Sequence, residues 1–199
     1  MVRLPKWSVD RSTIEWLTER EVGEVLRQAQ QTSPNHHALI ALMAMLGLRV
    51  SEACGIQIED MRMDPTSHYM LITVNRKGGW SEDVPVPMPL LRVIEFARGD
   101  RTDGPLIRTR RGRQQTRNGA YLWVRTLCRK AGLREGIHPH SFRHAHATAL
   151  LNAGVSLTEV QKSMGHRDIR STEWYCHLPT SMDQHAAHVS ARVFAGAAA

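Results

Sequence analysis

The sequence has few cysteines and no long apolar run. Its three cysteines, Cys54, Cys128 and Cys176, are odd in number and include no C-x-x-C pair. This excludes a disulfide framework and a cysteine zinc knuckle, and it is typical of a reducing compartment. The longest apolar stretch, residues 38–48, is too short to span a bilayer and lacks a signal-peptide pattern. We therefore expect a soluble, cytoplasmic protein with no membrane partner.

Acidic residues are scarcer than basic ones. The chain has 26 Lys and Arg against 19 Asp and Glu, which gives a net charge of +7 and a pI near 9.9. This balance favours a polyanionic partner such as nucleic acid, and a merely basic surface is the alternative. A length of 199 residues with 42% hydrophobic residues suits one compact domain that buries a core.

Helix-start signals recur along the chain. Thr18 with Glu21, and Ser156 with Glu159, have the spacing of capping boxes, and Ser33-Pro34 is also typical of a helix start. Apolar residues three and four apart continue the pattern behind each signal. We predict helices over about residues 18–31, 35–46, 90–97, 119–132, 140–152 and 156–164, a short helix around Tyr175, and a last helix from residue 180.

The period changes between residues 56 and 87. Side chains alternate at 70–74 and 83–86, and Lys77-Gly78-Gly79 is a turn signal. This predicts three antiparallel strands with Lys77 in the second turn, ended by the prolines at 85, 87 and 89. The predicted fold class is mainly α with a small three-stranded antiparallel sheet (α+β).

Two segments carry groups suited to chemistry. Arg49 directly follows the predicted core helix, and Ser51 is placed to cap a short helix that would fix Arg49 at the junction. On the predicted helix 140–152, His140, Arg143 and His144 are three and four residues apart and share one face. This predicts a surface with one cation and two imidazoles, and histidines satisfied within the core are the alternative.

A polar segment from 98 to 117 is rich in arginine. It is either a solvated loop or a loop that contacts phosphate. The candidate DNA contacts are Arg108, Arg110, Arg111, Arg113 and Arg117, together with Arg76 beside Lys77.

His166 and Tyr175 are nine residues apart, which would put them on opposite sides of one continuous helix. Asp168 and Ser171 supply capping groups for a break, so a fold-back would bring the two together. A buried tyrosine ring with its hydroxyl bonded to backbone is the alternative.

These motifs together resemble the catalytic domain of the tyrosine recombinase (phage integrase) family. A single His-x-x-Arg is weak, but the whole set in the family's order and spacing is specific, and the resemblance covers residues 18–187. The matching motifs are Gly47-Leu48-Arg49-Val50-Ser51-Glu52, Lys77 in a hairpin turn, His140-x-x-Arg143, Gly165-His166 and Tyr175, with the closing motif over 164–177.

The resemblance implies a site-specific DNA recombinase that cleaves and rejoins strands. Tyr175 would attack a phosphodiester to give a 3′-phosphotyrosyl intermediate, while Arg49 and Arg143 stabilise the charge on the phosphate. Lys77 would be the general acid for the leaving 5′-oxygen. Its ordinary pKa is about 10.4, so cationic neighbours would have to lower the pKa for Lys77 to serve in this role.

Further roles follow from the same resemblance. His140 would assist deprotonation of the tyrosine or bind phosphate, and His166 would donate a hydrogen bond to phosphate. Glu52 resembles the family's orienting carboxylate, and His144 is a supporting residue. The bond energy stays in the phosphotyrosine, so no ATP, metal or other cofactor is expected.

The sequence departs from the family pattern in two places. Trp80-Ser81-Glu82-Asp83 follows Lys77 where members often carry further basic residues. Residues 1–17, which we interpret as an arm or linker, are too few for the family's N-terminal core-binding domain. We therefore expect either a catalytic fragment or a short member similar to the fimbrial phase-switch invertases.

The expected organisation is a catalytic domain over 18–179 followed by a C-terminal helix and tail over 180–199. The tail would dock onto a neighbouring protomer, in a tetramer assembled on paired double-stranded DNA sites. The expected location is the cytoplasm, with the protein either associated with the bacterial nucleoid or encoded by a phage or mobile element.

Three alternatives stay open. A type IB topoisomerase-like enzyme would nick and reseal DNA with the same groups. A non-catalytic DNA-binding member would keep the fold, although phosphate binding alone has no need of Tyr175. A metal site at His140 and His144 is opposed by the charge of Arg143 between them.

Overall fold

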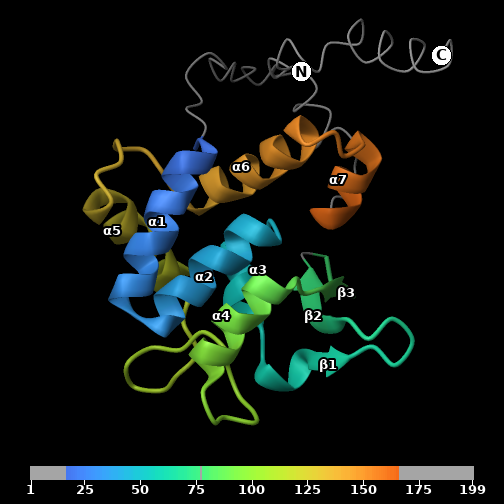
Figure 1. Ribbon diagram of the computed structural model, residues 1–199. Coiled ribbons are helices and arrows are strands. Elements are labelled where there is room, and N and C mark those ends of the chain that lie inside the picture. Colours follow the sequence, from blue (N-terminus) through green and yellow to red (C-terminus); the bar gives the residue numbers. More distant parts are fainter. Residues whose placement is uncertain (1–16, 77, 166–199) are drawn as a thin grey trace, which may run out of the picture.

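The computed structural model describes residues 17–76 and 78–165. The predicted mainly α fold with one small sheet is confirmed (Figure 1). Its elements follow in the order α1 (Glu19–Thr32), α2 (Pro34–Met45), α3 (Val50–Gly55), the 3-10 helix η2 (Ile58–Asp60), β1 (Met61–Met63), β2 (Met70–Arg76), β3 (Trp80–Pro85), α4 (Met88–Arg98), α5 (Arg117–Lys130), α6 (Pro139–Asn152) and α7 (Leu157–Ser163). The predicted helices around Tyr175 and from residue 180 lie outside the described residues.

Helix α2 lies at the centre of the core. All residues from Ala38 to Met43 are fully buried, because α1, α4 and α6 pack around this helix (Figure 1). A helix that is apolar all round is typical of such a position, whereas a surface helix has one apolar stripe. The predicted core helix is thus confirmed, and its end delivers the loop that carries Arg49 to the interior of the domain.

Local capping sets where the helices begin. The Thr18 hydroxyl accepts the backbone N–H of Glu21 (3.2 Å), and the Glu21 carboxylate accepts that of Thr18 (2.8 Å), so the predicted capping box is formed. Ser33 and Ser156 cap α2 and α7 through a backbone N–H three residues further on. Helix α6 begins at Pro139, one residue earlier than predicted, because proline lacks the N–H that a first helical turn leaves unpaired.

The strands form one antiparallel sheet in the order β1-β2-β3, as predicted. Arg76 at the end of β2 pairs with Trp80 at the start of β3, across the turn at 77–79. Ile72 and Val74 are fully buried while Asn75 is exposed, the alternation of a sheet with one covered face. Arg76 continues the buried series, so the pattern places a guanidinium where a strand normally buries an apolar side chain.

A second, smaller apolar cluster joins α7 to α6. Ala147, Val160 and Met164 are fully buried within it. This packing holds the end of α7 against α6, at the point from which the chain continues to His166. None of the described helices combines the length and the apolar character that a membrane span requires.

Candidate active site

The predicted catalytic residues divide into two groups. The structure describes Arg49, His140 and Arg143. Lys77, His166 and Tyr175 lie outside the described residues. The described part of the site is therefore built from the loop after α2, the end of β2 and the first turns of α6.

Arg49 is held at the start of α3 by the carboxylate of Glu52. One oxygen accepts the backbone N–H of Arg49 (2.8 Å), and the other accepts its guanidinium Nη1 (2.7 Å). The expected cap from Ser51 is wrong, because the helix begins at Val50 and Ser51 lies inside its first turn. Glu52 fixes Arg49 instead and leaves its side chain 28% exposed.

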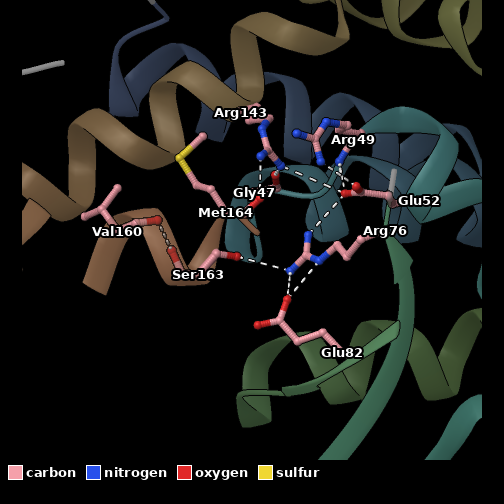
Figure 2. A network of polar contacts seen from close by, with 9 residues as sticks. All are labelled: Gly47, Arg49, Glu52, Arg76, Glu82, Arg143, Val160, Ser163 and Met164. Atoms are coloured by element: carbon pink, nitrogen blue, oxygen red, sulfur yellow. Dashed lines mark hydrogen bonds and ion pairs between the residues drawn. The ribbon is translucent and has the colours of Figure 1, made fainter. Parts of the chain in front are cut away.

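Glu52 is the shared partner of three arginines (Figure 2). Its Oε2 accepts Nη1 of Arg76 at 3.2 Å and lies 3.9 Å from Nη1 of Arg143. Burial raises the pKa of Glu52, but hydrogen bonds from Arg49 and the charges of Arg49 and Arg76 outweigh it, so the pKa lies below its ordinary value. One ionised carboxylate thus orients both arginines that are expected to bind phosphate.

Gly47 fits this junction for two reasons. Its φ of 60° lies in the left-handed region that favours glycine. A Cβ at this position would lie 2.5 Å from Cδ2 of His146 on α6, which is too close for any side chain. The Gly47 carbonyl in turn accepts Nη1 of Arg143 at 2.5 Å. The absence of a side chain therefore lets the α2–α3 loop approach α6 closely enough to bond Arg143.

Arg143 is buried rather than presented on an open surface. Its side chain is 1% exposed, and its guanidinium donates to the backbone carbonyls of Gly47 and Met164. The expectation that Arg143 shares an open face with His140 and His144 is therefore wrong, because the α2–α3 loop and the end of α7 cover it. Helical periodicity tells which residues share a side, but not what packs against that side.

The two histidines lie nearer the solvent, His140 exposed and His144 half-buried. Their rings meet edge to face with centroids 4.6 Å apart. Loss of water around its ring, and then the charges of Arg143, His138 and Arg49, lower the pKa of His140. The lowered pKa favours the neutral ring, in which one nitrogen is able to accept a proton. Among the described residues, no three His, Cys, Asp or Glu gather as a metal site requires.

Arg76 departs most from its expected role. The Arg76 side chain is 1% exposed, and each of its three guanidinium nitrogens donates to Glu52, Glu82 or the carbonyl of Ser163 (Figure 2). The expectation that it contacts DNA therefore does not hold. The signal that could have indicated this was present in the sequence, since Arg76 shares the buried side of β2 with Val74.

The other candidate DNA contacts lie between α4 and α5. The backbone N–H of Thr109 donates to the carbonyl of Arg113 (2.7 Å), and Arg108 bridges to Gln114, so the segment forms an ordered turn. Arg108 is half-buried, and the exposed members are Arg110, Arg111, Arg113 and Arg117. Their contact with phosphate stays a prediction.

The sequence matches the model of the phage integrase family over residues 15–182, which is most of its length. The chain belongs to the phage integrase family. Tyrosine recombinase XerA of Thermococcus kodakarensis is 32% identical over 178 residues, covering 87% of this chain and 61% of that protein. XerA of Pyrococcus furiosus is 29% identical over 181 residues, covering 88% and 62%. This phage integrase family member thus spans about three-fifths of the length of the curated relatives it matches.

Solved structures agree with this assignment of the phage integrase fold. A crystal structure of XerA recombinase superposes with a TM-score of 0.72 at 21% identity, covering 92% of this chain and 65% of that one. A lambda integrase dimer bound to a core site gives 0.65 at 16% identity, covering 79% and 59%. The resemblance to a tyrosine recombinase catalytic domain, and the fold class it implied, are confirmed.

Sequence reasoning missed two residues that shape the site of this family member. His146 packs against Gly47 and fixes the distance between α6 and the arginine loop. Glu82 pairs with Arg76 at 2.9 Å across the hairpin. The approach of His146 to Gly47 joins distant parts of the chain and left no local signal.

Proposed function

We propose that this chain is the catalytic domain of a site-specific DNA recombinase that cleaves and rejoins strands through a 3′-phosphotyrosyl intermediate. The observation that carries the proposal is the convergence of Arg49 and Arg143 on Glu52, with His140 on the same helix as Arg143. Two guanidiniums at one place suit the two non-bridging oxygens of a phosphodiester. Solved proteins of similar fold include XerH recombinase bound to its difH substrate, which supports double-stranded DNA as the substrate class.

The proposed cleavage step exchanges one phosphorus–oxygen bond for another. The oxygen of Tyr175 forms a bond to phosphorus while the bond from phosphorus to the 5′-oxygen breaks. His140 accepts the phenolic proton, and Lys77 donates a proton to the leaving 5′-oxygen. The reverse step, with the 5′-hydroxyl of another strand as nucleophile, rejoins the DNA and releases the tyrosine.

The two arginines have different shares in this step. Arg49, with its partly exposed side chain, contacts the phosphate from the solvent side, and buried Arg143 stabilises it from the inner side. His166 adds a hydrogen bond to the same phosphate, and His144 supports His140 through the ring contact. Donors already in place stabilise the charge of the transition state without reorganising, and removing one such donor typically costs on the order of 10²–10³ in rate.

The energy of the broken bond is kept in the phosphotyrosine, so the proposed reaction uses neither ATP nor metal. A substrate of chromosomal or mobile-element DNA places the enzyme in the cytoplasm, at the nucleoid. The curated relatives are longer than this chain, by enough to hold a further domain. In the proposed scheme an N-terminal DNA-binding domain closes around the duplex.

Strand exchange further requires several copies on paired DNA sites, for which we propose a tetramer. The C-terminal segment 180–199, with apolar residues such as Val189 and Phe194, would dock onto a neighbouring protomer. A cavity of about 540 Å³ between α1 and α6, lined by Leu17, Val22 and Phe142 among others, is a receiving site of suitable character. Truncation after Pro179 should then abolish synapsis and alter sedimentation on DNA, and unchanged behaviour would dispose of the docking.

The decisive experiment uses a nicked suicide substrate that traps the covalent intermediate. Wild-type protein should form a protein–DNA adduct, and Tyr175→Phe should bind the same DNA without forming one. The matched control is Tyr121→Phe, which removes a hydroxyl from a 40% exposed tyrosine on α5 and should leave the adduct unchanged. An adduct with Tyr175→Phe, or none with the wild type, would contradict the proposal.

The same protein separates the related alternatives. Relaxation of a supercoiled plasmid without recombinant product would favour a type IB topoisomerase-like enzyme. Binding without any cleavage would favour a non-catalytic DNA-binding member. Cleavage that persists in the presence of a strong chelator would exclude the hypothesis of a catalytic metal bound by histidines.

A further inference from the structure

Arg76 connects three parts of the chain that are far apart in the sequence. Its Nε donates to Glu82 Oε2 (3.0 Å), Nη1 to Glu52 Oε2 (3.2 Å) and Nη2 to the carbonyl of Ser163 (3.3 Å). The guanidinium thus directs Nε and Nη2 to Glu82 on β3, Nη1 to Glu52 on α3, and Nη2 also to the end of α7, as Figure 2 shows. A rigid planar fork makes this possible, whereas the single ammonium of a lysine would not reach all three partners.

The burial of this group makes its geometry strict. The side chains of Arg76 and Glu52 are 1% and 3% exposed, so water does not replace a lost partner easily. A buried guanidinium is tolerated only when its charge and its N–H groups are satisfied. A shift of the β2–β3 hairpin therefore pulls on the carboxylate that also holds Arg49.

The guanidinium also supports the chain where it leaves α7. A Cβ on Gly165 would lie 2.8 Å from Nε and 3.0 Å from Cζ of Arg76, so the arginine packs directly on this backbone. Gly165 has a φ of 60° and precedes His166 in the sequence. Arg76 itself precedes Lys77, so it adjoins one predicted catalytic residue in sequence and supports the chain just before another.

We propose that Arg76 is a positioning residue that holds the Lys77 turn in register with the arginine pair and with the chain leaving α7. The proposal rests on the proposed function, in which Lys77 protonates the leaving 5′-oxygen. Arg76 contacts no DNA in this scheme. It acts through Glu82 on the hairpin, through Glu52 on Arg49, and through Ser163 and Gly165 on the segment that follows α7.

The test compares two suicide substrates, one with the natural 5′-oxygen at the scissile phosphate and one with sulfur in its place. A thiolate leaves without being protonated, so misplacing the general acid slows only the oxygen substrate. Glu82→Gln removes the hairpin partner, and Arg76→Lys keeps the charge but loses the fork. In single-turnover cleavage both variants should slow the oxygen substrate by about 10- to 100-fold, below the full general-acid contribution of 10²–10⁴. Glu82→Gln leaves the Glu52 contact in place and should cleave the sulfur substrate at close to the wild-type rate. Arg76→Lys also loosens Glu52 and should slow the sulfur substrate less than the oxygen substrate.

Two controls calibrate the comparison. Asp83→Asn alters the neighbouring carboxylate, whose arginine partner Arg62 lies on the exposed face of the sheet, and it should leave both substrates unaffected. Lys77→Ala should slow the oxygen substrate more than either test variant and regain rate with sulfur. Equal losses on both substrates in Glu82→Gln and Arg76→Lys, or no loss on either, would overturn the positioning role.

A second measurement needs no cleavage. Hydrogen exchange should rise in Arg76→Met at the amide of Gly79, which donates to the Arg76 carbonyl, and at that of Gly165, which donates to Lys162. The amide of Leu91 in α4 should stay protected as in the wild type. Unchanged exchange at Gly79 and Gly165 would contradict the positioning role of Arg76. If the wild-type protein forms no adduct on either substrate, the proposed function is rejected. The exchange of these amides would still test whether Arg76 holds the hairpin and the end of α7.

Discussion

Arginines lie in two regions of this chain that differ in their surroundings and in what the arginines do there. Arg76 and Arg143 are almost fully buried and bond carboxylates and backbone carbonyls around Glu52. The arginines of the turn between α4 and α5, such as Arg111, are exposed. Burial fixes the direction of every donor in the first region, whereas in the second the charges act mainly through their summed field. The same residue type thus builds the site in one place and attracts a polyanion in the other.

This contrast is also energetic. Exposed ion pairs contribute about 0–1 kcal/mol because water screens them. Removing one partner of a buried pair costs about 3–5 kcal/mol, because the remaining charge stays desolvated. Net charge therefore gives little information on which arginines bind DNA, since some of the +7 depends on side chains that the fold encloses.

The largest effect is expected from Glu52→Gln, which removes the charge shared by three guanidiniums. We expect the free energy of unfolding to fall by about 3–5 kcal/mol, measured by urea denaturation. The matched control is Glu159→Gln, since the Glu159 carboxylate pairs with Lys162 at an exposed position and its loss should change stability by less than about 1 kcal/mol. Equal losses of unfolding free energy in the two variants would contradict the expected energetic difference between buried and exposed ion pairs.

Arg143→Lys tests how much the buried region contributes to the rate of DNA cleavage. It keeps the charge but loses the fork, so we expect cleavage to slow by on the order of 10²–10³ while DNA affinity changes little. Arg101→Lys is the control, because Arg101 also donates to backbone carbonyls, among them Ala97 and Pro105, but belongs to the loop after α4. Adduct formation on a suicide substrate is the measurement. A comparable slowing by both variants would assign the effect to folding rather than to the site.

The pH dependence of stability should reflect the same carboxylate. The pKa of Glu52 is lower in the folded state than its ordinary value of about 4.3, so its ionised form stabilises the fold. The extra stability of wild type over Glu52→Gln should be fully present above the ordinary pKa and lost as pH falls through the lower, folded pKa. Urea denaturation of both proteins from neutral to acid pH measures it. A difference that does not narrow in acid would contradict the assignment.

The smallest effect on stability is expected in the exposed region. Arg111→Ala should change the free energy of unfolding by less than about 0.5 kcal/mol. It should weaken DNA binding and reduce the slope of log K against log salt by about 0.9 if Arg111 neutralises one phosphate. Arg20→Ala, an exposed arginine on α1, is the control and should leave the slope unchanged. An unchanged slope for Arg111→Ala would favour the solvated-loop alternative.

Local signals made most of the fold predictable. The capping box at Thr18 and the caps at Ser33 and Ser156 act within three residues, and each begins a helix where expected. The change of period near residue 56 correctly gave three antiparallel strands. The exception was Ser51, because the helix begins at Val50 and Glu52, not Ser51, accepts the backbone N–H of Arg49 at its start.

The sequence alone determined the family, the order of the elements and the set of residue types at the site, because these depend on neighbours along the chain and on motif spacing. Only the tertiary structure decided which arginines are enclosed. Arg76 and Arg143 are buried by partners on β3, α3 and α7 and by the loop after α2. The free energy of a charge depends on whether water or a fixed partner surrounds it, and folding brings those partners together from distant parts of the sequence.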